Sequence, residues 1–112
     1  MMGDLEYRVA ELERLLMEVI SFGKIKEIDE SNARVKVAKG GNLTDWIPWT
    51  ARRSGPDREW WIPEEEEQVL LLCPGGNTAL AVALPAIYQT AFPPPSDSRH
   101  VHRVEYQDGA FT

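Results

Sequence analysis

The chain has 112 residues, of which 43% are hydrophobic and 27% are charged, and its formal net charge at pH 7 is −6. This length accommodates one compact domain with one appendage. No apolar run reaches the roughly 18 residues that a membrane-spanning helix needs. Five acidic residues precede Ser21, which is unlike a secretory signal, so we expect synthesis in the cytoplasm. The single cysteine, Cys73, excludes an intrachain disulfide and a metal site built on thiolates.

The charge is unevenly distributed along the chain. Residues 22–58 carry a net charge of +3, whereas the ten residues that follow, 59–68, carry −5. A protein that binds nucleic acid usually presents a basic face, because neutralising phosphates supplies much of the affinity. The charge pattern therefore disfavours a nucleic-acid role.

The first 21 residues predict a helix that pairs with copies of itself. Residues 4–21 contain neither Gly nor Pro, Asp4 can cap the helix, and Gly23 is expected to end it. Apolar residues follow the alternating 4-3 spacing of a coiled-coil seam, in which Arg8 can pair with Glu13 of a neighbouring helix. The seam residues are Leu5, Val9, Leu12, Leu16 and Val19.

An alternative for this helix is an amphipathic segment that lies on its own domain. Two and a half heptads fall short of the three to four that a coiled coil usually shows. The narrowness of the apolar stripe nevertheless favours the coiled coil. Because so short a helix would be marginal alone in water, we expect a trimeric coiled coil at residues 1–21 whose assembly the following domain supports.

Residues 22–91 alternate between strand and turn patterns. Pro48 and Pro85 interrupt two of the extended segments, as at an edge or a bulge. Several short strands at close spacing are typical of a small closed barrel such as an OB-fold. The predicted fold class is therefore mainly β with an N-terminal α-helix. The expected extended segments are 22–28, 34–38, 43–51, 68–73 and 78–88.

The strands between Gln68 and Leu84 are apolar at nearly every position, which indicates burial on both faces. A small barrel has one interior, so something else must cover the outer face of these strands. A partner subunit is the simplest cover, which again favours a homotrimer.

Residues 92–112 are expected to form a linker and the first strand of a further domain. Three consecutive prolines, 93–95, stiffen a polar segment that has no core-forming content. Residues 103–106 have a strand pattern, and Asp108-Gly109 is a hairpin turn signal. The returning strand would begin at Phe111, so we expect the rest of this domain beyond Thr112.

No residues show the pattern of a catalytic or metal site. His100 and His102 share one face of an extended segment, a spacing that can bind a metal, but two solvent-facing linker histidines are the favoured interpretation. The consecutive carboxylates at 64–67 point apart and indicate a solvated charge run, not an acid–base pair. Residues 75–77 lack the Lys and Ser/Thr of a phosphate loop. We therefore expect neither enzymatic activity nor a cofactor.

The tryptophans are the strongest candidates for binding. On an OB-like barrel, exposed rings beside Arg52, Arg53 and Arg58 could stack single-stranded bases, so a nucleic-acid-binding module is the alternative function. The favoured interpretation places two rings inside the barrel and the others in a protein interface, where Trp is enriched. All four lie within sixteen residues, and they are Trp46, Trp49, Trp60 and Trp61.

Five blocks from residue 45 onward carry a family resemblance. Their order resembles the phage baseplate assembly protein V family, which is related to the spike proteins of contractile tails and type VI secretion systems. The resemblance covers about residues 5–112, and the succession of blocks is far more specific than any one of them. The blocks are 45–49 (DWIPW), 52–55 (RRSG), 60–63 (WWIP), 67–70 (EQVL) and 73–77 (CPGGN).

Two positions depart from the family pattern. Glu66 stands where family members commonly have Gly, and residues 82–86 stand where members commonly have a Gly-rich segment. Both departures concern local turn geometry. They leave the expected fold unchanged.

The resemblance implies a trimeric tail spike with an N-terminal helix, an OB-fold domain and a C-terminal β-helical needle that meets the host membrane. It implies a structural hub in the virion tail baseplate, or in an equivalent contractile particle, that links the tail tube and other baseplate proteins to the needle. The needle and its iron would lie outside this chain, so no metal is assigned to His100 or His102. The motif residues expected in the core or an interface are Trp46, Pro48, Trp49, Trp60, Trp61, Pro63, Gln68, Val69, Gly75 and Gly76.

Overall fold

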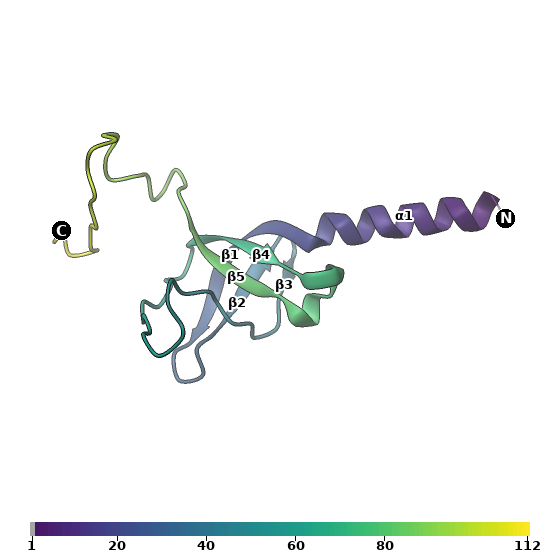
Figure 1. The fold of residues 1–112 in the computed structure, drawn as a ribbon, viewed down its shortest axis with the longest axis horizontal. Helices are drawn as coiled ribbons and strands as arrows, with labels where there is room; N and C mark the ends of the chain where they lie inside the picture. The colour runs from purple at the N-terminus through teal and green to yellow at the C-terminus, as the bar shows by residue number, and fades with distance from the viewer. Residues whose placement is uncertain (1) are drawn as a thin grey trace.

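The computed structural model describes residues 2–112, which form a long helix, a small β-structure and an extended C-terminal segment. Helix α1, Met2–Val19, projects from one end of the β-structure, and the C-terminal segment lies at the opposite end (Figure 1). The molecule is consequently elongated, with principal extents of 63 × 34 × 30 Å. None of the helices in the described residues is long and apolar enough to cross a bilayer.

Helix α1 passes directly into strand β1, Ile20–Asp29. The predicted helix is confirmed, but Gly23 does not end it. Ile20 already pairs with Leu72 across the sheet. The carbonyl of Val19 accepts a hydrogen bond of 2.7 Å from the backbone N–H of Cys73. The helix therefore ends where the chain begins to pair with β4 (Gln68–Leu72) and the residue after it, and not at a glycine.

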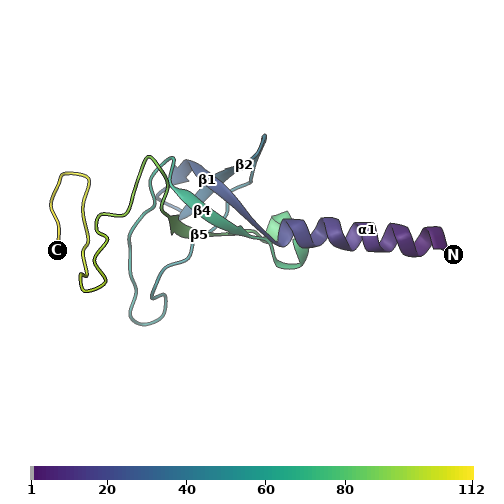
Figure 2. The same cartoon turned by 90° about the horizontal axis from the view of Figure 1, so that it is seen from above.

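The β-structure is one antiparallel sheet with the strand order β3-β2-β1-β4-β5. Figure 2 shows β1, β4 and β5 leading away from the base of α1. The long strand β1 is central and pairs with β2 on one side and with β4 on the other. Besides β1, the strands are β2 (Arg34–Lys39), β3 (Asn42–Leu43), β4 (Gln68–Leu72) and β5 (Val82–Ile87).

Residues 47–50 close this sheet into a barrel. Ile47 exchanges two backbone hydrogen bonds of 2.8 Å with Val35 on β2. The same segment bonds to β5, because Ala83 donates to the carbonyl of Pro48 and accepts from the N–H of Thr50, both at 2.9 Å. One short connection thus joins two strands that are not neighbours in the sheet order.

The barrel interior is filled by alternate side chains of the paired strands, as the period of two along a strand requires. Val35 and Val37 are fully buried, which confirms the predicted inward face of β2. The other buried core residues are Ile25, Ile47, Val69, Leu71, Cys73, Ala81 and Ala83. Burial also raises the pKa of the Cys73 thiol.

Two of the expected strands differ from the prediction. The segment 43–51 is mostly irregular, with isolated bridges at Ile47 and Trp49, because it crosses between two strands instead of pairing along one. The last strand begins at Val82, since Asn77 caps a short helix η2, Thr78–Leu80, through a 3.0 Å bond from the N–H of Ala79. Local side-chain capping therefore competes with the apolar strand pattern.

The C-terminal residues form the expected hairpin. Val104 and Thr112 exchange backbone hydrogen bonds of 2.8 and 2.9 Å, and Gly109 takes the left-handed conformation in the turn with a φ of 89°. Phe111 lies across from Glu105 and receives the Arg103 guanidinium over its ring at 4.2 Å. The Asp108-Gly109 turn signal is confirmed.

Candidate oligomer interface and the aromatic end of the barrel

The apolar seam of α1 is uncovered within the chain. Leu5, Leu12 and Leu16 are each at least 60% exposed, and Val9 is 45% exposed. Only the last turn of the helix reaches the barrel, where Val19 is half-buried. The alternative of an amphipathic helix lying on its own domain is therefore wrong.

Charged residues on the outer side of the helix form ion pairs within residues 2–112, whereas those beside the seam do not. Arg14, on the outer side, bonds to Glu11 at 2.6 Å and to Glu18 at 3.3 Å, and the hydrogen bond from Arg14 lowers the pKa of Glu11. Arg8 and Glu13 flank the seam, and neither forms an ion pair with another residue in the described part of the chain. In a parallel coiled coil, these two positions face each other on adjacent helices.

The turn η1, Pro74–Gly76, supports the base of the helix. Gly76 is buried with a φ of 72°, and a Cβ built there would lie 2.9 Å from Leu15 Cδ2 and 3.1 Å from the Leu15 carbonyl oxygen. Gly75 has a φ of 64° and open space around the same position. The sequence marked both glycines as motif residues, but it did not reveal Leu15 as the side chain that packs on Gly76.

All four tryptophans lie outside the buried core. Trp49 packs against the core and lies 5.6 Å from Trp60, and Trp61 stacks on Tyr106 of the C-terminal hairpin at 5.9 Å. Trp46 lies on another side, with Lys36 Nζ 5.0 Å from its ring centre. The buried core of the described residues contains no tryptophan, so the expectation of two rings inside the barrel is wrong. Aliphatic side chains and Cys73 fill the core positions instead.

The arginines near these rings are held by acidic neighbours. Arg52 forms a two-pronged pair with Glu59, in which Nε donates at 2.8 Å, and this hydrogen bonding lowers the pKa of the Glu59 carboxyl. Arg53 lies 3.9 Å from Asp57 within the same small hairpin loop. Both cations are therefore already paired within the chain.

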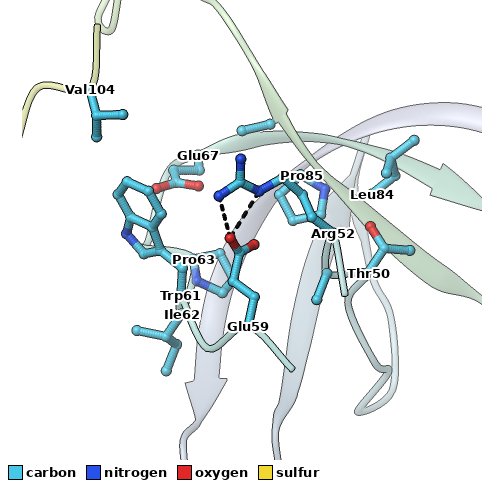
Figure 3. A pocket seen from close by; sticks show the side chains of 12 residues that line it. Thr50, Arg52, Glu59, Trp61, Ile62, Pro63, Glu67, Leu84, Pro85 and Val104 are labelled. Atoms are coloured by element: carbon cyan, nitrogen blue, oxygen red, sulfur yellow. Dashed lines mark hydrogen bonds and ion pairs between the residues drawn. The ribbon is translucent and has the colours of Figure 1, made fainter. Parts of the chain in front are cut away.

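A cleft of about 450 Å³ lies between the two segments that flank this loop, strand β5 and the C-terminal segment. Figure 3 shows the Arg52 guanidinium facing the Glu59 carboxylate, with Trp61 on one side and Leu84 on the other. Glu67 also lines the cleft, and its partial burial raises the pKa of its carboxyl. The cleft is largely apolar and contains an internally satisfied ion pair.

The remaining motif residues belong to the framework of the barrel. Pro63 and Val69 are buried, and Pro48 contributes its carbonyl to the closure of the barrel. Gln68 begins β4, where it pairs with Lys24 and Ile87. These residues hold the barrel and its end loops together.

The two linker histidines are exposed. In residues 2–112, no group of three or more His, Cys, Asp or Glu side chains is placed to hold a metal ion. His100 and His102 have no such companions among the residues described.

Comparison with known proteins identifies the family. A model of the type VI secretion system/phage-baseplate injector OB domain matches residues 22–88, which include all five strands except the first two residues of β1. The chain belongs to this family. The injector OB domain is thus the barrel that residues 47–50 close, and α1 and the C-terminal hairpin flank it. The resemblance found in the motif blocks is confirmed.

A relative of known role matches a longer part of the chain. The spike protein of Escherichia phage P2 is 41% identical over 102 residues, which is 91% of this chain. The chain spans about half, 48%, of the length of that relative. The matched region therefore includes residues outside the injector OB domain.

Proposed function

We propose that this chain forms the trimeric base of a contractile-tail spike, a structural role without enzymatic activity. The observation that carries the proposal is the exposed apolar seam of α1 on a chain of the injector OB domain family. Several large apolar side chains in a row are costly to leave in water, so a seam of this kind favours a protein partner.

The charges beside the seam favour identical chains as the partners. Arg8 can bond to Glu13 of the next helix in a parallel arrangement, while Arg14 is already satisfied by Glu11 and Glu18 of its own helix. Three parallel copies would thus satisfy the seam and its flanking charges together.

The shape of the chain suits a hub. Helix α1 and the C-terminal segment leave the barrel at opposite ends (Figure 2). We propose that one end contacts the tail tube and other baseplate proteins, and that the other end continues toward a needle that contacts the host membrane. The protein would accordingly reside in the tail baseplate of a virion or an equivalent contractile particle.

Sedimentation equilibrium of the full chain at micromolar concentration tests the proposal. The expected mass is three times the 12.7 kDa of one chain. Replacing Leu12 by Glu should raise the dissociation constant at least about tenfold, because a charge would enter the seam. The matched control is Met17→Glu, which changes a residue 78% exposed outside the seam and should leave the mass unchanged. A monomer at all micromolar concentrations would refute the trimer.

A further inference from the structure

The outer face of the barrel carries two apolar rows next to the base of α1. In the first row Ile20 pairs with Leu72, which pairs with Val82. In the second row Phe22 pairs with Leu70, which pairs with Leu84. Paired residues point to the same side of a sheet, so these six side chains form one surface. We call it the β1–β4–β5 face.

This face is uncovered in the single chain. Phe22 is 62% exposed, Ile20 58% and Leu84 38%, while the other three residues are half-buried. The barrel does not need these side chains for its own core, because the alternate residues of the same strands already fill the interior. Their apolar character therefore requires a different explanation.

The rest of the sheet shows what a solvated outer face looks like in this protein. On β2, the outward residues include Arg34 and Lys36, which alternate with buried Val35 and Val37. In the row beyond Phe22, the residues on β1 and β4 are polar: Lys24 pairs with Gln68, and Gln68 pairs with the half-buried Ile87 of β5. The rows that are apolar on all three strands are thus the two nearest the helix.

The face continues the seam of α1 without interruption. Val19 is the last seam residue, and Ile20 is the first residue of the face. An 18-residue helix is only about 27 Å long, and its seam is shorter than the three to four heptads of a stable coiled coil. A stable interface buries roughly 800 Å² on each partner, so a helix this short needs additional contact area.

We propose that the β1–β4–β5 face is the second half of the interface between copies of this chain, and that it contributes more to assembly than the helix seam does. The inference rests on the proposed trimer. The occupant of the face is the barrel of an adjacent copy, because the face adjoins the seam and a parallel pairing of helices brings the two barrels to the same level. In a cyclic trimer, each barrel would offer this face to its neighbours around the axis.

The test measures the dissociation constant of full-length variants by sedimentation equilibrium. Phe22→Lys and Ile20→Lys are made separately, and each changes a side chain that is exposed in the single chain, so the barrel should still fold. The matched control is Leu43→Lys, which changes a 49% exposed leucine on β3, outside the face. Circular dichroism and tryptophan fluorescence of each variant report whether the barrel is intact.

We expect each face variant to dissociate at least about tenfold more readily than the parent, and more readily than Leu12→Glu, with Leu43→Lys unchanged. Trimers of unaltered affinity in both face variants, together with dissociation of Leu12→Glu, would overturn the inference and leave the trimer intact. A monomeric parent would instead refute the proposed function, and both outcomes are read from the same runs.

Discussion

At the scale of single residues, Glu66 adopts a left-handed backbone conformation that favours glycine. Its φ is 71°, a conformation that an L-residue with a side chain adopts at a cost of about 1–2 kcal/mol. Three contacts hold it there. Its N–H donates to the Ile25 carbonyl at 2.8 Å, its carbonyl accepts from Gln89 Nε2 at 2.8 Å, and its carboxylate bonds to Lys26 Nζ at 2.6 Å. The bond to Lys26 also lowers the pKa of the Glu66 carboxyl.

A pair of substitutions at this position separates backbone strain from the ion pair. Glu66→Ala and Glu66→Gly both remove the bond to Lys26, but only glycine also removes the strain. We expect Glu66→Gly to be more stable than Glu66→Ala by about 1 kcal/mol, the reverse of the order in ordinary strand positions. Urea unfolding at one fixed chain concentration measures the difference. Equal stability, or a more stable alanine variant, would show that the left-handed conformation is not strained.

At the scale of elements, the direction of α1 depends on a small turn. The carbonyl that ends the helix, at Val19, is bonded by Cys73, and the next turn of the chain presents Gly76 against Leu15. A helix with most of its length in solvent has few other contacts to fix its angle. The turn 74–76 is therefore the support that holds the helix in line with β1.

Two neighbouring glycines provide a matched test of this support. Gly75→Ala introduces left-handed strain alone and should destabilise the chain by about 1–2 kcal/mol. Gly76→Ala introduces the same strain and also a methyl group 2.9 Å from Leu15 Cδ2, so it should destabilise by about 1–3 kcal/mol more. Thermal unfolding followed by circular dichroism compares the two variants. If both lose the same stability, Leu15 does not press on Gly76.

At the scale of the whole molecule, the distribution of charge and aromatic rings disfavours single-stranded nucleic acid as a ligand. The net charge is −6. Arg52 and Arg53, two of the three arginines that the nucleic-acid hypothesis needs, are paired with Glu59 and Asp57. The Trp61 ring is stacked on Tyr106 and cannot receive a base on that face. The paired arginines and the stacked Trp61 ring thus make contacts within the chain instead of being free for a ligand.

Tryptophan fluorescence tests this conclusion directly. Titration of the full chain with a short single-stranded oligonucleotide at low salt should leave the emission unchanged, because phosphate binding needs unpaired cations and stacking needs free rings. The matched variant Glu59→Gln, which releases Arg52, should show at most weak and salt-sensitive quenching. Strong quenching of the parent chain that disappears at higher salt would restore the nucleic-acid hypothesis.

Several features of this protein follow from sequence alone. The seam of α1, the alternation of β2 and the Asp108-Gly109 turn each depend on neighbouring residues, because the helical and strand periods are set by the local backbone. The order of the motif blocks predicted the injector OB domain without any coordinates. The seam residues Leu5, Val9, Leu12 and Leu16 are exposed in the single chain, and their contact with other copies stays a prediction.

Only the tertiary structure decided which distant segments of the chain contact one another. The closure of the barrel by residues 47–50, the seat of Leu15 on Gly76 and the pairing of Lys26 with Glu66 join segments that are far apart in sequence. The placement of the tryptophans outside the core was likewise not predictable, since an aromatic strand pattern is the same for a ring that points inward or lies at the end of a barrel. Local periodicity fixes which side of an element is apolar, whereas the partner that covers that side depends on how distant strands are brought together.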